Sequence, residues 1–289
     1  MASKLKPLLY GILYITLLSS LSAPSVIKEI EPDKSSKEFI INVISYNIHH
    51  CNPPAKRGVI EIDSIASVIV RSGADIAFLQ EVDKNVTRSG VEDQAALLTN
   101  KSGLHYYHFY KAIDFMGGEY GVAILSRYPL KDLKNTPLDS PQKSEERVLG
   151  TAVVEIGDNI SILLANTHLD LNPINRTRQI TQIDSIIKDS PFGVILAGDF
   201  NATPESDQIQ YLIKNYIIPT SRLEYTFPNE TPDRTIDYIF IKNPGKDNHP
   251  TAPTQTTTKP HLEFVTYKVL HNINASDHLP IIAQIRISL

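Results

Sequence analysis

The stretch FIINVISYNIHH (residues 39–50) decides the fold of this chain. Residues 39–46 are mostly apolar or β-branched, which is typical of a strand that is buried on both faces. Two polar residues, Asn47 and His49, follow this run. Polar groups at the end of a buried strand cost free energy unless they find partners. The stretch therefore predicts a central strand that ends in a site.

Outward from this stretch, strand and helix patterns alternate along the chain. Apolar residues at helical spacing predict helices at 60–72, 92–99, 175–188 and 205–214. Short apolar runs predict strands at 74–79, 106–110, 121–126, 151–156, 160–166, 193–197, 236–241 and 281–287. Segment 243–262, rich in Pro, Thr and Asn, predicts a surface loop. This mixture predicts a layered α/β or α+β domain.

Polar residues stand at the ends of several other predicted strands. They are Glu81, His168, Asp170, Asp199, Asn201, Asp237, Asp277 and His278. Any one of them can be a strand-end cap, but a charge beside a buried strand costs several kcal/mol unless it is paired or bound to a metal. So many together indicate one functional site.

The residue types of this cluster indicate its chemistry. Oxygen donors predominate, and oxygen ligands suit Mg²⁺ or Mn²⁺ better than a structural zinc. The chain has no Gly-rich run that ends in Gly-Lys-Ser or Gly-Lys-Thr, which excludes a P-loop nucleotide site. It also has no Gly-x-Ser-x-Gly sequence, which removes the corresponding serine-hydrolase hypothesis.

Six short motifs follow one another along the chain: SYNIHH (45–50), LQEV (79–82), NTHLD (166–170), GDFN (198–201), IDYIF (236–240) and SDH (276–278). In this order they resemble the endonuclease/exonuclease/phosphatase superfamily, which includes deoxyribonuclease I, abasic-site endonucleases, neutral sphingomyelinases and inositol polyphosphate 5-phosphatases. The resemblance covers about residues 38–289. It implies a four-layered α/β sandwich, in which two mixed β-sheets pack face to face with flanking helices and the site lies at one edge.

The resemblance also implies which residues bind metal and activate water. Glu81, helped by Asn47, would hold Mg²⁺, with Mn²⁺ as the alternative, and Asp277 would lie on the metal side. Asp199 would orient or deprotonate the attacking water, with Asn201 beside it to position water or a phosphate oxygen.

A second group of residues would act on the phosphate. His278 would bind a phosphate oxygen or act in acid–base catalysis, with Asp237 fixing its tautomer. His168 would donate to the phosphate, with Asp170 in support. Two arginines are further candidates for phosphate contacts. Arg147 resembles the arginine that contacts phosphate in the family, and Arg234 stands close to Asp237 in sequence, with a pair to Glu230 or Asp233 as its alternative role.

Two residues in or beside the first motif, His49 and Cys51, need separate consideration. His49 stands where several nucleases of the family have an aspartate. It can extend the metal site, contact phosphate or line the pocket, and we favour the last. Cys51 is the only cysteine, so no intrachain disulfide forms. We expect Cys51 to be a small buried side chain beside the site.

The N-terminal segment predicts export. Lys4 and Lys6 precede an apolar run at 8–21 that ends among small residues, the pattern of a secretory signal peptide. We therefore expect a signal peptide at 1–22, a linker at 23–37 and one catalytic domain at 38–289, in a secreted or periplasmic protein. The alternative is an uncleaved membrane anchor, although the run is shorter than the roughly 20 residues that a spanning helix needs.

The leading functional hypothesis is a Mg²⁺-dependent phosphodiesterase or phosphatase that acts, as a monomer, on a small or lipid phosphoester. Membrane contact would come through the N-terminal segment or a lipid substrate. The first alternative is a secreted endonuclease similar to deoxyribonuclease I. Nucleic acid is the less favoured partner, because the net charge is −4 and only Lys111, Arg127 and Lys131 offer a start to a basic groove. The second alternative, a catalytically inactive binding relative, is disfavoured because the core site residues are all present.

Overall fold

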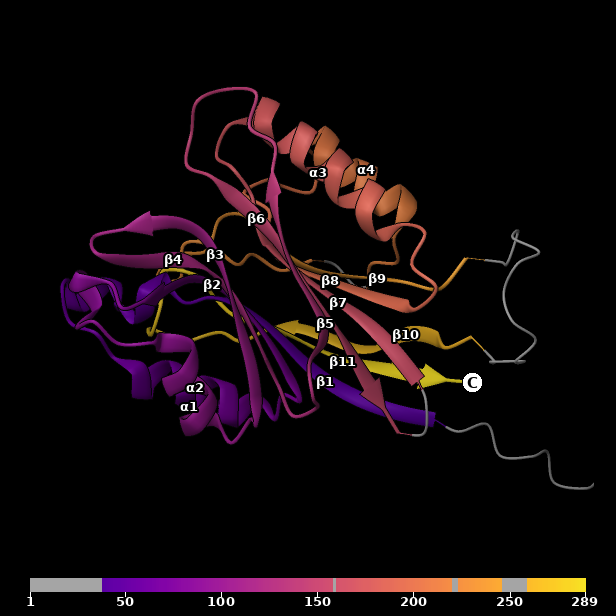
Figure 1. Cartoon of the computed structure of the whole chain (residues 1–289), viewed down its shortest axis with the longest axis horizontal. Helices are drawn as coiled ribbons and strands as arrows, with labels where there is room; N and C mark the ends of the chain where they lie inside the picture. The colour runs from indigo at the N-terminus through magenta and orange to yellow at the C-terminus, as the bar shows by residue number, and fades with distance from the viewer. Residues whose placement is uncertain (1–37, 158–159, 220–222, 246–258) are drawn as a thin grey trace, which may run out of the picture. The chain divides into compact units, whose positions relative to one another are not determined.

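The computed structural model describes residues 38–157, 160–219, 223–245 and 259–289. They belong to one compact unit, Ser36–Leu289, whose strands and helices are labelled in Figure 1. The expected signal peptide (1–22) and linker (23–37) lie outside the described residues. Within the described ranges, no helix combines the length and the apolar character that a membrane crossing requires.

The first sheet has six strands in the order β10-β11-β1-β2-β4-β3. Their bounds are β1 (Glu38–Asn47), β2 (Ile76–Lys84), β3 (Tyr106–Phe115), β4 (Gly118–Ser126), β10 (His261–Val269) and β11 (Ile281–Ser288). Strand β1, which carries the stretch FIINVISY, runs parallel to β2 and antiparallel to β11. Val43 and Ile44 of β1 are fully buried and belong to different core clusters. β1 is therefore buried on both faces, as its sequence predicts.

The second sheet has five strands in the order β5-β6-β7-β8-β9. Their bounds are β5 (Lys131–Leu138), β6 (Arg147–Ile156), β7 (Ile160–His168), β8 (Gly193–Asp199) and β9 (Asp237–Lys242). Strands β7 and β8 are parallel, and the other neighbours in this sheet are antiparallel. Each sheet thus contains one parallel pair, β1–β2 in the first and β7–β8 in the second.

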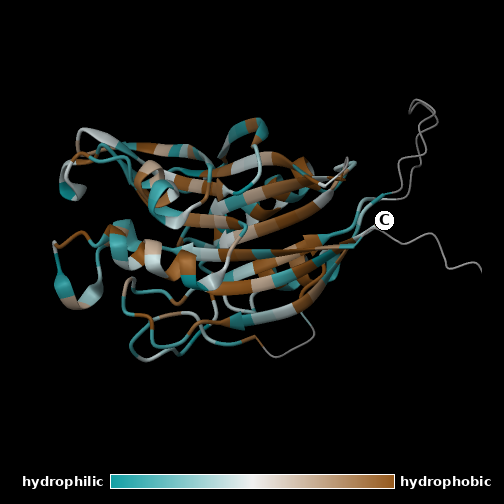
Figure 2. Cartoon of the chain, turned by 90° about the horizontal axis from the view of Figure 1, so that it is seen from below, coloured by the Kyte–Doolittle hydropathy of each residue, from teal (hydrophilic) through white to brown (hydrophobic). Residues whose placement is uncertain are grey.

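Helices cover the outer faces of both sheets (Figure 1). Helices α1 (Ile62–Ser72) and α2 (Gln94–Ser102) pack on the first sheet, and α3 (Pro173–Ile187) and α4 (Asp207–Asn215) on the second. A third core cluster lies between the sheets, and Figure 2 shows apolar residues running along the strands. Three short 3₁₀ turns complete the fold: η1 (His49–Cys51), η2 (Pro54–Lys56) and η3 (Thr87–Ser89). The four-layered sandwich predicted from the sequence is confirmed.

Two strands, β5 and β10, are missing from the sequence prediction. Both lie at a sheet edge, and most side chains of β5 are exposed. An edge strand needs no buried face, so its sequence can lack the apolar pattern that identifies a central strand. The predicted loop at 243–262 was wrong at its end, since β10 begins at His261. Residues 246–258 of that segment lie outside the described residues.

The two parallel pairs explain why the polar motifs meet. Parallel strands end at the same edge, so Asn47 lies opposite Gln80 in the first sheet and His168 opposite Asp199 in the second. Strand β9 runs antiparallel to β8, which places its first residue, Asp237, opposite Asp199 as well. The strand ends of both sheets therefore supply one common site.

Candidate active site

Asp199 lies at the centre of the cluster. One of its oxygens, Oδ2, is 3.1 Å from Asn47 Nδ2, 3.4 Å from His168 Nε2 and 3.7 Å from His278 Nε2. Its other oxygen accepts a hydrogen bond of 2.9 Å from the backbone N–H of Asn201. Asp199 is almost fully buried. A buried carboxylate that faces two imidazoles can exchange protons with them or with a water held between them.

Strands β7 and β8 lie unusually close together just before Asp199, because residue 198 is glycine. Gly198 has a φ of +150°, and a Cβ atom there would lie 2.0 Å from the carbonyl oxygen of Thr167. Any side chain at this position would push β7 and β8 apart. Since His168 and Asp199 end these two strands, Gly198 keeps the imidazole beside the carboxylate.

His278 is held by a second carboxylate. Its Nδ1–H donates to Asp237 Oδ2 at 3.0 Å, which directs Nε2 toward Asp199. Burial alone lowers the pKa of an imidazole, but the charges of Asp237 and Asp199 outweigh it and raise the pKa of His278 to about 10. His278 is therefore an imidazolium at neutral pH, and the role predicted for Asp237 as its orienting partner agrees with this geometry.

The same burial changes the carboxylate. Burial and the negative charge of Asp237 raise the pKa of Asp199 to about 7, against the opposing effect of His278. A carboxylate with a pKa near neutrality can accept a proton from water and release it again at physiological pH. This property suits the water-activating role that the sequence assigns to Asp199.

His168 takes the opposite protonation state. Arg147 can only donate, so its Nη1, 3.2 Å from His168 Nδ1, makes that nitrogen the acceptor and places the ring proton on Nε2, toward Asp199. Burial and the charges of Arg147 and His278 lower the pKa of His168 well below its usual value. His168 is thus a neutral donor at neutral pH.

Asp170 is held by a hydrogen-bond network of its own. Its carboxylate accepts hydrogen bonds from Ser144 Oγ, from Asn175 Nδ2 at 2.9 Å and from the backbone N–H of Asn172 at 2.7 Å. These contacts tie the β5–β6 connection to the start of α3, whereas His168 is held by Arg147 and Asp199. Asp170 therefore anchors the segment before β6 to the start of α3, and its support of His168 stays a prediction.

Glu81, His49 and His50 form the other side of the site. Among the described residues these three can bring one ligand atom each within 4.8 Å of one another. Asn47 Nδ2 donates to Glu81 Oε1 at 3.0 Å, and Asn47 Oδ1 accepts the backbone N–H of His49 at 3.1 Å. The predicted metal residue Asn47 therefore fixes Glu81 and Asp199 through its amide nitrogen. The donor set of carboxylate and imidazole groups suits a divalent cation.

Asp277 and Cys51 flank this side. Asp277 Oδ1 lies 3.9 Å from His49 Nδ1, and its role in metal binding stays a prediction. Cys51 is fully buried, as predicted, and burial raises the pKa of its thiol far above the usual value. A thiol that stays protonated is a poor nucleophile and a poor ligand, so Cys51 acts as a packing residue.

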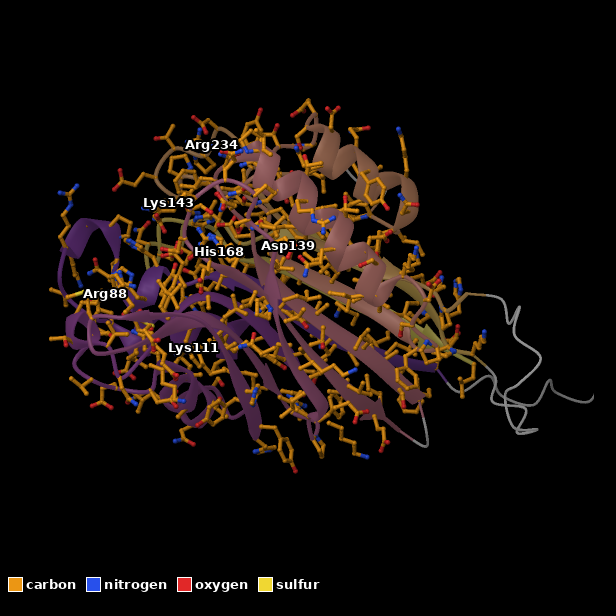
Figure 3. All side chains as sticks on the ribbon, turned by 45° about the horizontal axis from the view of Figure 1, so that its top comes forward. Arg88, Lys111, Asp139, Lys143, His168 and Arg234 are labelled. Carbon is orange, nitrogen blue, oxygen red and sulfur yellow. The ribbon has the colours of Figure 1, made fainter. Side chains whose placement is uncertain are left out.

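Arg234 reaches the site through an aromatic ring. Its guanidinium lies 5.0 Å from the ring centroid of Phe227, whose ring is in turn 4.7 Å from that of His278. Arg234 Nε is 3.3 Å from Asp233 Oδ1, the alternative pairing expected from the sequence. In the view of Figure 3, His168 lies between the labelled side chains of Arg234 and Lys111.

A buried amide pair next to the site was missed by the sequence analysis. Gln80 Nε2 donates to Asn166 Oδ1 at 2.8 Å, and Asn166 Nδ2 donates to the carbonyls of Leu79 and Ala123 at 2.9 and 2.8 Å. These bonds join the two sheets one residue before Glu81 and two before His168. Their signal in the sequence is a polar amide inside each of the motifs LQEV and NTHLD.

Arg88 is a second residue that the sequence analysis missed. It donates from Nε and Nη2 to the fully buried Asp83, at 2.8 and 2.9 Å, and lies 4.7 Å from the ring centroid of Phe115. These contacts fix the loop after β2 beside Glu81. Nothing in the spacing of Arg88 marks it in the sequence, because its partners come from two separate segments.

Comparison with known proteins agrees with this geometry. The model of the endonuclease/exonuclease/phosphatase family matches residues 44–278. The chain is 25% identical over 275 residues to the uncharacterized protein YbhP of Escherichia coli strain K12, across 89% of this chain and 100% of YbhP.

Solved structures share the fold. An endonuclease/exonuclease/phosphatase from Beutenbergia cavernae has a TM-score of 0.69 at 21% identity, covering 86% of this chain and 72% of its own. A mannosyl-6-phosphatase from Bacteroides thetaiotaomicron has a TM-score of 0.65 at 19% identity, covering 85% and 99%. The family match spans the strand-end cluster from β1 to His278. This chain belongs to the endonuclease/exonuclease/phosphatase family, whose members hydrolyse phosphoesters.

Proposed function

We propose that this protein is a secreted, divalent-metal-dependent hydrolase of a small phosphoester, either a monoester or a diester. One observation carries the proposal: Asp199 Oδ2 faces the amide of Asn47 and the Nε2 atoms of His168 and His278, at 3.1 to 3.7 Å. A water beside this oxygen would be positioned for in-line attack on a phosphorus atom held by the two histidines.

Each group has a distinct task in this reaction. Asp199 takes the proton of the attacking water, because its pKa of about 7 allows it to act as a base at neutral pH. The imidazolium of His278 and the Nε2–H of His168 donate to oxygens on which negative charge builds up. Arg147 adds positive charge behind His168.

The metal would be held on the Glu81 side. Glu81, Asp277, His49 and His50 supply its donor groups, and Asn47 orients Glu81. A divalent cation bound there would neutralise charge on the phosphate oxygens. This is the only contribution that the proposal takes from the metal.

The charges around the site favour a small substrate over nucleic acid. Of the three basic residues that the sequence offers for a nuclease groove, two lie away from the site. Arg127 pairs with Asp75 before the start of β2, and Lys131 lies opposite Val153, at the far end of β6 from Arg147. The third, Lys111, is paired with Asp114 at 2.6 Å. A paired cation contributes less to phosphate-backbone binding, which depends on unneutralised charge. The similarity to a mannosyl-6-phosphatase lends further support to a small phosphoester.

The proposal assigns the leaving group to a cavity beside Arg234. A cavity of about 360 Å³ is lined by Thr203, Glu205, Tyr225, Arg234 and other residues of the β8–α4 and 223–235 segments. An aromatic ring with polar and charged neighbours suits a hydroxylated leaving group better than an acyl chain. The proposal therefore favours a water-soluble ester over a lipid.

The decisive experiment is a substrate panel with matched variants. Purified protein (residues 23–289) would be assayed on p-nitrophenyl phosphate, bis-p-nitrophenyl phosphate, sugar phosphates, sphingomyelin and plasmid DNA, with divalent metal and with chelator. We expect turnover of a small ester that stops in chelator, and its loss in Asp199→Ala and His278→Ala. Asp63→Ala, which removes an exposed carboxylate on α1, is the control. Undiminished turnover in Asp199→Ala would reject the mechanism.

Export is tested separately. The proposal of secretion is supported by the sequence of residues 1–22, which lie outside the described residues. Expression of the full chain in a bacterial host, followed by N-terminal sequencing of the extracytoplasmic fraction, should show removal of this segment. Retention of Met1 in a membrane fraction would favour the anchor.

A further inference from the structure

His49, His50 and Glu81 bring two imidazoles and one carboxylate together at the edge of the site. Their ligand atoms lie within 4.8 Å of one another. A metal ion binds nitrogen and oxygen ligands at roughly 2.0 to 2.2 Å, so movements of about an ångström would close the three groups around one ion. The roles assigned to the six sequence motifs do not account for two adjacent histidines at this position.

The tautomer of His49 is set for metal binding. Its Nδ1–H donates to the backbone carbonyl of Asn52 at 2.9 Å. This bond leaves Nε2 as the nitrogen with an available lone pair. A ring nitrogen that donates to a backbone carbonyl while the other binds metal is the usual arrangement of a histidine ligand.

His50 has a nitrogen that lacks a partner. Its Nδ1 is buried and forms no hydrogen bond within the described part of the chain. A buried polar atom without a partner costs about 1–3 kcal/mol, and such atoms in native structures call for an explanation. The backbone of His50 is firmly held, since its carbonyl accepts a hydrogen bond of 2.7 Å from the fully buried Gln94. The ring is therefore presented from a fixed position.

The backbone at these residues is strained. His49, His50 and Glu81 have φ values of +44°, +42° and +56°, a region that residues other than glycine seldom adopt. Each such residue costs of order 1–3 kcal/mol and persists where the surrounding structure holds it. The strain places all three ligand-bearing side chains together, which agrees with a binding role.

The neighbouring amide contributes its nitrogen to this arrangement. Asn47 directs Nδ2 to Glu81, and its oxygen accepts the backbone N–H of His49. Besides the carboxylates of Glu81 and Asp277, the groups here that can donate a lone pair are the two imidazoles of His49 and His50. Imidazole ligands favour transition metals, whereas Mg²⁺ requires mostly oxygen ligands and bound water.

We propose that His49, His50 and Glu81 bind a divalent transition metal, Mn²⁺ or Zn²⁺ in preference to Mg²⁺. The inference names the metal of the proposed hydrolase site and two of its nitrogen ligands. It rests on the proposed function only in assigning the bound ion a part in hydrolysis. It replaces the role of pocket lining that the sequence favoured for His49.

Direct metal binding tests the inference without reference to turnover. Metal-free protein would be titrated with Mn²⁺ and Mg²⁺ by calorimetry, and Mn²⁺-loaded protein would be studied by pulsed electron paramagnetic resonance, which detects coordinated imidazole nitrogen. The variants are His49→Asn, His50→Asn and the double variant. Asparagine tolerates the left-handed backbone at low cost, and His105→Asn, an exposed histidine next to β3, is the matched control.

We expect nitrogen coupling to Mn²⁺ in the native protein and in His105→Asn. It should diminish in each single variant and vanish in the double variant. Each single variant should weaken Mn²⁺ binding at least about tenfold, since even changes behind a ligand cost 10- to 100-fold. Mg²⁺ binding should be weaker than Mn²⁺ binding in the native protein.

Three results would overturn the inference: no nitrogen coupling in the native protein, Mn²⁺ affinity that survives in the double variant, or variants that lose only inorganic phosphate binding. The last would assign the histidines to the phosphate. Absence of nitrogen coupling in the native protein overturns the inference even if a variant fails to fold, and a signal that survives in the double variant would assign the ion to the cluster of Asp199, Asp237 and His278. Mn²⁺ coupled to nitrogen without turnover of any ester would reject the proposed function alone. Turnover with Mg²⁺ and no nitrogen coupling would reject this inference alone.

Discussion

The side chains of Asn47 and Asp199 are joined by a hydrogen bond of 3.1 Å from Nδ2 to Oδ2, between residues that are 152 positions apart in the chain. Asn47 ends β1 in the first sheet, and Asp199 ends β8 in the second. The same amide nitrogen donates to Glu81 at 3.0 Å. One side chain therefore sets the distance between Glu81, in the proposed metal site, and Asp199, the carboxylate that we propose activates water.

Replacing Asn47 with alanine should misplace both carboxylates at once. We expect kcat on the best small ester to fall by roughly 10- to 100-fold, the usual effect of losing a residue that orients a metal ligand. Metal affinity should fall with it. Steady-state kinetics and calorimetric metal titration check this, and unchanged kcat together with unchanged affinity would contradict the bridging role.

Replacing Asp237 with asparagine should remove the charge that stabilises the His278 imidazolium while keeping the shape of the side chain. An orienting carboxylate of this kind contributes as much as about 10⁴-fold to kcat in other hydrolases, so we expect a loss of roughly 10²- to 10⁴-fold. KM should rise as well, because a neutral His278 holds the anionic phosphate less firmly. The nitrogen chemical shifts of His278 report its protonation directly. An imidazolium that persists in the variant would show that Asp237 is not its main partner.

His168 predicts a pH dependence of stability. Its pKa in the folded state lies well below 6.5, so at lower pH the unfolded chain binds a proton that folded His168 does not. This residue's contribution to the free energy of unfolding should therefore fall as pH decreases below about 6.5, by at most about 1.4 kcal/mol per pH unit. Urea unfolding of the native protein and of His168→Asn between pH 5 and pH 7.5 isolates the effect. Parallel curves for the two proteins would exclude it.

Asn166→Ala should destabilise the sandwich. The variant leaves the carbonyls of Leu79 and Ala123 and the amide of Gln80 without a partner in a buried setting. Each orphaned group costs about 1–3 kcal/mol, and we expect a total loss of roughly 2–5 kcal/mol in the free energy of unfolding. Asn135→Ala, which removes an exposed side-chain bond to the carbonyl of Lys111, should cost much less and serves as the control. Equal losses in the two variants would refute the role of the buried amide pair.

The strands that are buried on both faces, and the residues at their ends, could be predicted from the sequence. β1, β2, β7, β8 and β9 are buried on both faces, so their apolar runs stand out, and the polar residues at their ends stand out against them. β5 and β10 could not be predicted, because each leaves many of its side chains in solvent, whereas β9, also at a sheet edge, is buried and could be predicted. The rule is physical: pattern reveals an element only where burial selects its residues.

The contacts inside the site could not be predicted from spacing. Asp170 stands two residues from His168 in NTHLD, yet its carboxylate points to Ser144 and Asn175, while His168 is held by Arg147 and Asp199. Alternate residues of an extended chain share a side, but the chain leaves β7 at His168 and turns toward α3. The adjacent histidines likewise become candidate metal ligands only because the fold brings Glu81, from another strand, beside them.

The bridge from Asn47 to Asp199 makes the reaction a property of the two sheets together. The first sheet and its connections carry Asn47, Glu81, Asp277 and His278, and the second carries His168, Asp199 and Asp237. If the two sheets move apart, the residues proposed to hold the attacking water and those proposed to hold the phosphate move apart with them. Neither sheet can then support catalysis alone. During gentle denaturation, turnover should therefore be lost before secondary structure. Activity then reports the packing of one sheet against the other.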